Sequence, residues 1–313
     1  MLNLKSKIPQ IVLVLVGLLY LGLLAKNLNE SKRRSLHLHA DARAADNVRV
    51  PMRILSADLN NGDVRVAMGF EVRGNIAIDA ATPAVDLKLL LNTSRGPQEV
   101  DFPKGRRMNP VEAVFNTTGD VDGYPFDQHA ASLGVKMVTP RRPDRPPAMG
   151  GSSAPEQYTS VPVEVDLSAS IPGVKFQGRS KMGTSEIGFL GDDQVVITLY
   201  MRRADNVIAT SIFVTVLMLG LGTGVLAMVL EVTVKGKESP LLPLSLSVSL
   251  IFGLPALRAL QPNVPPLGVL CDYFGYVWAE LIVAASTIAV VWTWHFRSRA
   301  KAAAETHKPE TPK

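Results

Sequence analysis

The sequence has few cysteine, aromatic and charged residues. It contains one cysteine, Cys271, in 313 residues, so the chain has to fold without an intramolecular disulfide. Aromatic residues make up 6% of the chain and charged residues 19%. Glycine-rich phosphate-binding motifs, the Gly-x-Ser-x-Gly pattern and the His-Glu-x-x-His pattern are absent. These absences argue against the common soluble enzymes, and we expect no catalytic residues.

Four long apolar blocks stand in the sequence instead. They cover residues 8–25, 207–230, 241–260 and 274–294. At about 1.5 Å per helical residue, their lengths suit a hydrocarbon core about 30 Å thick. Helices inside a soluble protein would show a polar stripe, whereas the block 207–230 has only Thr and Ser for polarity. The sequence therefore predicts a multi-pass membrane protein with four transmembrane helices.

The first apolar block, residues 8–25, could also be a cleaved signal peptide. Small residues are missing from the expected cleavage position, where Leu23-Leu24-Ala25-Lys26 stands. The small residues of Ala42-Arg43-Ala44 lie too far downstream. We therefore expect an uncleaved signal anchor.

The orientation of the chain does not follow from its charges, because basic residues are nearly balanced between the two sides. A dense basic tail directly follows the last block, and a signal-anchor-like helix begins the chain. We therefore expect both termini in the cytoplasm and the middle domain outside the plasma membrane. The net charge of +5 then reflects topology and lipid headgroup contact, not nucleic-acid binding. The predicted order is cytoplasmic N-terminus 1–7, helix 8–25, external domain 26–205, helix 206–230, cytoplasmic loop 231–240, helix 241–260, external loop 261–272, helix 273–295 and cytoplasmic tail 296–313.

The middle domain alternates apolar and polar residues with period two, as the run 63–72 shows. This period is typical of strands with one buried face. No convincing amphipathic helix interrupts the runs, so we predict an extracytoplasmic antiparallel β-sandwich, with a barrel as the alternative. The stretch 139–155 is rich in Pro and Gly and is expected to be an exposed loop. The predicted strands are 48–55, 64–72, 85–91, 111–116, 130–138, 161–167 and 194–201.

The most distinctive local motif is a turn that contains Tyr124, Pro125, Phe126 and Asp127. Pro125 fixes its own φ and restricts the residue before it, so the two aromatic side chains are presented at a defined turn. Asp127 is expected to accept hydrogen bonds from backbone amides of that turn. We predict a structural or coupling role. A hydrolase that uses Asp127 and His129 is the less favoured interpretation.

Glu280 falls inside the last apolar block, where an ionisable side chain is costly and usually has a partner. Arg258, near the end of the preceding block, is the expected partner, and Asp272 is its competitor. We predict a structural ion pair between these helices, with a proton or ion relay as the alternative. Gly220 and Gly224 form a Gly-x-x-x-Gly pair, which predicts close helix packing within the bundle or self-association.

Metal and cofactor sites are not expected. His37 and His39 with Asp41 could begin a metal site, but no third and fourth ligand follows at a suitable spacing. An exposed stalk is the simpler interpretation of these residues.

The arrangement of motifs resembles a known family. An N-terminal anchor is followed by a β-rich domain with Gly123-Tyr124-Pro125-Phe126-Asp127, and then by three apolar blocks with Pro265-Pro266-Leu267-Gly268 and Trp278-Ala279-Glu280. In these features the chain resembles the bacterial membrane family called domain of unknown function 4436. The resemblance spans nearly the whole chain and implies architecture only, because the family has no assigned activity.

A second resemblance concerns the turn alone. Residues 124–127 are similar to the Phe-Pro-Phe-Asp turn at the membrane-facing end of pentameric ligand-gated channels. Those channels have a Cys pair around the turn and four spans after the domain, whereas this chain has neither. The resemblance implies only that the turn faces the helices.

The sequence thus predicts a membrane protein of the cell envelope that is not an enzyme. Its β-domain is expected to serve a structural or accessory role by binding a protein, lipid or glycan partner, and a homo-oligomer is possible. The alternative is a channel- or transporter-like sensor. In that case a ligand on the β-domain would act on the helices through residues 202–205, which join the last strand directly to the second helix.

Overall fold

The computed structural model describes residue 22 and residues 36–40, 44–140, 158–182, 194–235 and 241–306. The predicted helix 8–25 and the predicted loop 139–155 lie almost entirely outside the described residues. The chain divides into two compact units. The β unit consists of Met1–Val121 and Asp127–Ala204, and the helix unit consists of Asp122–Phe126 and Asp205–Lys313.

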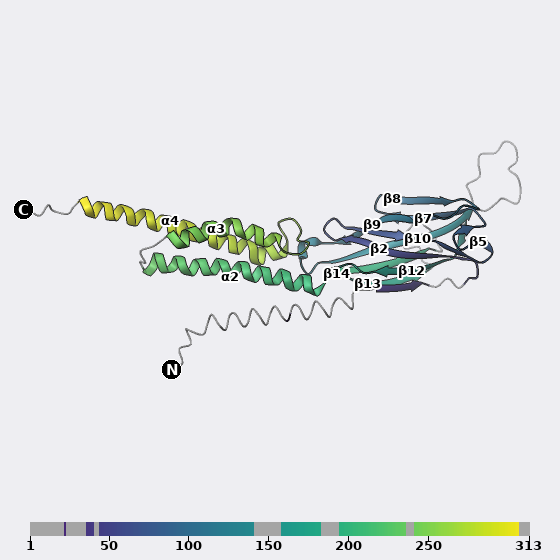
Figure 1. Ribbon diagram of the computed structural model, residues 1–313, viewed down its shortest axis with the longest axis horizontal. Coiled ribbons are helices and arrows are strands. Elements are labelled where there is room, and N and C mark those ends of the chain that lie inside the picture. The colour runs from purple at the N-terminus through teal and green to yellow at the C-terminus, as the bar shows by residue number, and fades with distance from the viewer. Residues whose placement is uncertain are drawn as a thin grey trace, which may run out of the picture. The chain divides into compact units, whose positions relative to one another are not determined.

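Strands make up most of the β unit, as Figure 1 shows. The alternation of buried and exposed residues matches the predicted period of two, for example in β3, where Val64, Val66 and Met68 are buried. The strands are β1 (Leu36–Ala40), β2 (Asn47–Asp58), β3 (Asp63–Met68), β4 (Glu71–Arg73), β5 (Ala77–Asp79), β6 (Thr82–Pro83), β7 (Leu87–Thr93), β8 (Gly96–Phe102), β9 (Val111–Gly119), β10 (Gln128–Pro140), β11 (Tyr158–Val161), β12 (Val163–Ala169), β13 (Val174–Met182) and β14 (Val195–Arg203).

Twelve of the described strands belong to one hydrogen-bonded sheet, whose main path runs β1-β12-β2-β3-β9-β10-β14-β13. Strand β9 pairs with β3 through residues 111–116 and with β10 through residues 117–119, so it joins the two halves of the sheet. At the ends of the path, the side chain of Leu38 in β1 lies directly over Gly178 in β13. The two end strands therefore approach each other, and the sheet is nearly closed.

The sheet is mixed, because β2 and β12 run parallel, with Val48 beside Val163. The other pairs among the described strands are antiparallel. The expectation of a β-rich domain is confirmed, but the expectation of an entirely antiparallel fold is wrong. The described strands form one nearly closed sheet, and the two separate sheets of a sandwich are not confirmed.

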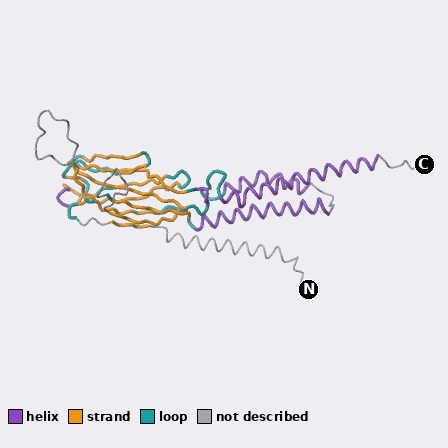
Figure 2. Tube along the Cα trace, turned by 180° about the vertical axis from the view of Figure 1, so that it is seen from behind, coloured by secondary structure: helices purple, strands orange, loops and turns teal. Residues whose placement is uncertain are grey.

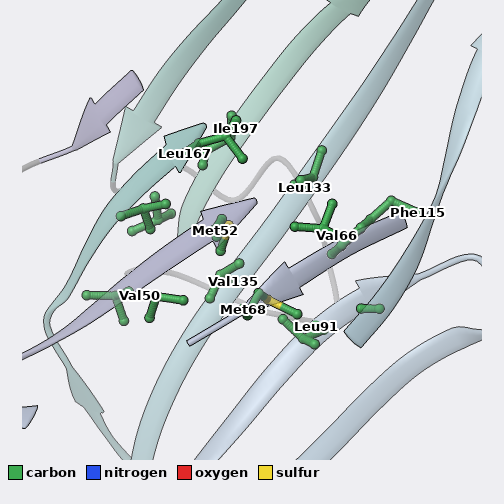
Figure 3. Close-up of a cluster of buried hydrophobic side chains, with 14 of the residues drawn as sticks. Val50, Met52, Val66, Met68, Leu91, Phe115, Leu133, Val135, Leu167 and Ile197 are labelled. Atoms are coloured by element: carbon green, nitrogen blue, oxygen red, sulfur yellow. The ribbon is translucent and has the colours of Figure 1, made fainter. Parts of the chain in front are cut away.

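The core of the β unit lies inside the nearly closed sheet. Figure 3 shows inward side chains from β2, β3, β7, β9, β10, β12 and β14 meeting in one cluster. Burying each large apolar side chain contributes about 1.5–3 kcal/mol, so this cluster supplies the driving force that the missing disulfides do not. The members labelled in Figure 3 are Val50, Met52, Val66, Met68, Leu91, Phe115, Leu133, Val135, Leu167 and Ile197.

Three long apolar helices form most of the helix unit, which confirms the three predicted C-terminal apolar blocks as helices. They are α2 (Asp205–Lys235), α3 (Leu241–Ala259) and α4 (Val277–Thr306), and a π-helical turn (Asp272–Tyr276) precedes α4. The helices run alongside one another, drawn in purple in Figure 2. Each is long and apolar enough to cross a membrane.

The three helices pack through small apolar clusters. Met218 of α2, Leu254 of α3 and Val283 of α4 are buried together in one of them. Arg297 of α4 donates hydrogen bonds of 3.0 Å to the carbonyl oxygens of Val232 and Thr233. These carbonyls belong to the last turn of α2, which has no helical partners for them, so Arg297 satisfies that helix end.

Candidate functional site

The turn predicted as a structural or coupling element belongs to the helix unit, although it interrupts the β unit in sequence. It begins in a short 3₁₀ helix, Val121–Gly123, and the amide of Phe126 donates to the carbonyl of Gly123 at 2.8 Å. The Tyr124–Pro125 peptide bond is cis. Tyr124 is fully buried in a cluster with Val269 and Cys271, whereas Phe126 is exposed.

The hydroxyl of Tyr124 joins three segments of the helix unit. It donates to the carbonyl oxygen of Pro262 at 2.9 Å and lies 2.7 Å from the hydroxyl of Ser211. Because the single hydroxyl proton of Tyr124 is directed to Pro262, Ser211 acts as the donor to Tyr124. Ser211 is completely buried in α2, so its hydroxyl depends on such a partner. The turn is therefore fixed both to α2 and to the loop between α3 and α4.

A second polar network lies beside these contacts. The Sγ of Cys271 donates to Oε1 of Gln261 at 3.3 Å, and Nε2 of Gln261 donates to the hydroxyl of Thr215 at 3.4 Å. Cys271 and Gln261 are buried. Sequence reasoning did not identify Gln261 or Thr215, because neither stands in a recognisable motif.

Asp127, the next residue after the turn, belongs to the β unit and is buried there. Nε of Arg203 lies 3.0 Å from both carboxylate oxygens, and Nε2 of His129 lies 2.9 Å from Oδ2. Burial by itself would raise the pKa of Asp127, but the hydrogen bonds with His129 and Arg203 and the charge of Arg203 outweigh it and hold the pKa below its ordinary value. The expected partners, backbone amides of the turn, are replaced by these two side chains.

This buried cluster ties distant strands together. Arg203 ends β14, His129 lies in β10, and Nη2 of Arg203 donates at 2.8 Å to Oδ1 of Asn60 in the turn between β2 and β3. Asp127 and His129 are each only 3% exposed, so the pair considered for hydrolysis is enclosed in the fold. The arrangement is suited to holding the strand ends in place.

The alternation in β14 contained a signal that would have identified Arg203. Residues 195, 197, 199 and 201 are inward-facing apolar residues, and position 203 continues the same face. An arginine at an inward position requires a buried acidic partner. Asp127 is that partner.

Arg258 forms its ion pair with Asp272, not with Glu280. Nε and Nη2 of Arg258 lie 2.6 and 2.8 Å from the two carboxylate oxygens, and Nη2 also donates to the carbonyl of Pro265 at 2.9 Å. Asp272 also accepts hydrogen bonds from the backbone amides of Gly268 and Val269. The partner of Arg258 is therefore Asp272 and not the expected Glu280. Asp272 lies at the start of the helical segment that faces the end of α3.

Glu280 lies two turns further along. Its Oε2 is buried and has no hydrogen-bond partner within the part of the chain that the structure describes. The relay role considered for it stays a prediction.

The close approach of α2 and α4 occurs at Gly222. A Cβ added there would lie 3.3 Å from the carbonyl oxygen of Ala279, so only glycine fits without movement. Gly220 and Gly224 are the residues that were expected to mediate packing. Each faces open space, because no described atom lies within 4 Å of a Cβ added there. Their role in self-association stays a prediction.

Two family models match the chain, and their boundaries follow the two units. The model described as Domain of unknown function (DUF8686) matches residues 203–297, and the model described as Domain of unknown function (DUF4436) matches residues 38–199. No curated protein matches the chain. The expected resemblance is confirmed for the β-rich part only, because the motifs at 265–268 and 278–280 fall within the other model. Since its match covers more than half of the chain, the protein belongs to the family described as Domain of unknown function (DUF4436).

Proposed function

We propose that the chain is an integral membrane protein of the cell envelope that uses its β unit to bind a partner. The observation that carries this proposal is the outward apolar surface of the three helices. Only 28%, 17% and 28% of the most apolar stretches of α2, α3 and α4 are buried. Side chains such as Val234 and Phe252 are more than three-quarters exposed. Apolar surface on this scale needs a lipid environment or another protein to cover it.

The aromatic residues of the last helical segment support a membrane position. One group of exposed rings lies at its start and a second group lies about three turns before its end at Thr306, and charged Arg297 and Arg299 follow the second group. Trp278 and Trp294 are 16 residues apart, which corresponds to about 24 Å along a helix. Aromatic rings at this separation match the two interfaces of a bilayer. The first group is Tyr273, Phe274 and Trp278, and the second is Trp292, Trp294 and Phe296.

The β unit has the properties of a binding module. It has a large core of its own, and its buried ion pair of Asp127 and Arg203 is formed within the unit. We infer that it acts by binding, not by catalysis, and that it lies outside the plasma membrane with both chain termini in the cytoplasm. Its partner is a protein, lipid or glycan of the envelope.

Membrane extraction and cysteine labelling test this proposal. In a Cys271→Ser background, Arg95→Cys places a thiol in the exposed β7–β8 turn, and Arg299→Cys places one near the C-terminus. In intact cells a membrane-impermeant maleimide should label Arg95→Cys, and it should label Arg299→Cys only after permeabilisation. The opposite pattern would refute the orientation. Release of the protein by alkaline carbonate without detergent would refute the membrane assignment.

The alternative function, a channel- or transporter-like sensor, is favoured by one specific observation. The Tyr124 hydroxyl binds Ser211 of α2 and Pro262, so the turn takes part in the packing of the helices. A sensor requires ion flux in liposomes that contain the purified protein, and Tyr124→Phe should change that flux. Absence of flux at acidic, neutral and alkaline pH would count against this alternative.

A further inference from the structure

An open pocket of about 550 Å³ lies on the outer face of the β unit, over β10, β14 and β13 and the end of β9. Its lining also includes His129, which contacts Asp127 in the buried cluster, but the side chains of Asp127, His129 and Arg203 are at most 3% exposed and point into the fold. The pocket is formed by polar and charged side chains on the outward positions of these strands, together with one aromatic ring. The residues that matter for its chemistry are Thr118, Gln128, Lys175, Gln177, Tyr200 and Arg202.

The strand register arranges these side chains in two rows. In the first row Gln128, Arg202 and Lys175 are direct cross-strand neighbours. In the next row Tyr200 of β14 is the direct cross-strand neighbour of Gln177 of β13. Direct neighbours of this kind have Cβ atoms about 5 Å apart, so the groups of both rows can reach one small ligand.

The chemistry of the rows suits a phosphate group. Arg202 and Lys175 supply two cations, and no carboxylate is among the lining residues. An arginine fork binds phosphate oxygens in pairs, and a lysine adds a point charge. Both cations also interact with other residues of the chain. The pocket therefore suits a phosphate because the two cations are aligned beside exposed amide and hydroxyl groups. Those groups can bind the polar group that is attached to the phosphate.

The covalent structure keeps this pocket close to the start of a transmembrane helix. Arg202 precedes Asp205, the first residue of α2, by three positions. Three residues of fully extended chain span at most about 11 Å. The headgroup layer on each side of a bilayer is about 5–8 Å thick. Phosphate groups of lipids are therefore the most concentrated anions within reach of Arg202.

We propose that this pocket binds the phosphate group of an anionic lipid. The proposal rests on the proposed membrane function and names the class of its partner. Arg202 and Lys175 bind the phosphate, and Gln128, Gln177 and Tyr200 contact the polar group beyond it.

Binding of lipid to the purified full-length protein tests the site. The protein in mild detergent is titrated with phosphatidylglycerol, with phosphatidylcholine as the lipid without net charge, and binding is followed by native mass spectrometry. The double variant Arg202→Gln/Lys175→Gln should weaken phosphatidylglycerol binding about tenfold or more, since each lost charged contact removes a strong hydrogen bond. Arg179→Gln is the matched control, because Arg179 is an exposed cation that lies in β13, as Lys175 does, but outside the pocket. It should change binding less than about twofold.

Equal binding of phosphatidylglycerol by the double variant and the wild type would overturn the proposal. Competition by glycerol phosphate as strong as that by the lipid would show a soluble phosphate ligand and overturn the lipid assignment. Both measurements are made in detergent, so they do not depend on which side of the membrane the β unit occupies. Carbonate extraction and cysteine labelling decide the proposed function separately.

Discussion

Replacing Asp127 by asparagine tests whether the buried cluster stabilises the β unit through charge. Asp127 and Arg203 are 3% and 2% exposed, and two contacts of 3.0 Å join them. Asparagine keeps nearly the same shape but leaves the guanidinium buried without a compensating charge. Breaking a buried pair in this way costs about 3–5 kcal/mol of the free energy of unfolding. Asp127→Asn should therefore be among the most destabilising polar substitutions in the β unit.

Urea unfolding of the full-length protein in mild detergent measures this effect. With an m value of about 2 kcal/mol per M, the midpoint of the β-sheet signal in circular dichroism should fall by about 2 M. The three tryptophans, at 278, 292 and 294, all belong to the helix unit, so their fluorescence reports that unit separately. Their transition should move much less.

Two variants serve as controls. Arg202→Gln removes the neighbouring but exposed arginine and should change the free energy of unfolding by about 0.5 kcal/mol or less. Asp127→Leu combined with Arg203→Met removes both charges and should recover a large part of the stability lost in Asp127→Asn. The reasoning is refuted if Asp127→Asn unfolds at the same urea concentration as the wild type. It is also refuted if the double variant is no more stable than Asp127→Asn.

Further predictions concern pH and the helix unit. Because the folded-state pKa of Asp127 lies below its unfolded value, its contribution to stability is present above about pH 4 and is lost as the pH falls further. Urea midpoints below pH 4 should therefore drop less steeply in Asp127→Asn than in the wild type. Tyr124→Phe should destabilise the helix unit by about 1–3 kcal/mol, measured by thermal unfolding followed by tryptophan fluorescence, because buried Ser211 loses its partner. Gly222→Val should cost about 1–3 kcal/mol in the same assay, since its added atoms would meet the backbone of α4, whereas Gly220→Val points into open space and should cost less. Equal costs for the two glycine variants would contradict the packing described for Gly222.

Period-two alternation predicted the strands with one strongly apolar face and missed the others. Strand β8 has Glu99 and Asp101 at every second position and few apolar residues between them. Strand β13 has Val174 and Phe176 on its inner face, but Gly178 continues that alternation without a side chain. Leu38 of β1 fills the space over Gly178. A distant strand therefore completes the pattern, and such a contact cannot be read from the local sequence.

The strand order could not be predicted from the period-two alternation either. Alternation shows which face of a strand is buried but not which strand lies beside it or in which direction. The parallel pairing of β2 with β12 brings together residues more than 100 positions apart. The predicted antiparallel fold reflected the prevalence of antiparallel pairs in β-rich domains without intervening helices.

The site was predicted in part. The turn at Tyr124 stood out because an aromatic-proline-aromatic string fixes a backbone, but its partners Ser211 and Pro262 carry no signal in the sequence. The partner of Arg258 was mistaken because charge alone did not distinguish two acidic residues. Asp272 lies eight residues before Glu280, about 12 Å along a helix, and is much nearer to the end of α3 where Arg258 stands.

The polar contacts at the turn support the proposed coupling role, which requires more than a covalent tether between the two units. A tether requires one covalent connection, and the peptide bond between Ala204 and Asp205 is sufficient for it. The chain also leaves the β unit for five residues, and Tyr124 is hydrogen-bonded within the helix unit while Asp127, three residues later, is ion-paired within the β unit. Three residues of chain give little slack, about 11 Å at most. A displacement of α2 that carries Tyr124 with it must therefore either act on the first residues of β10 or break the contact with Ser211. Breaking that contact would leave a buried hydroxyl without a partner, so the proposed coupling role expects transmission to β10 as the less costly response.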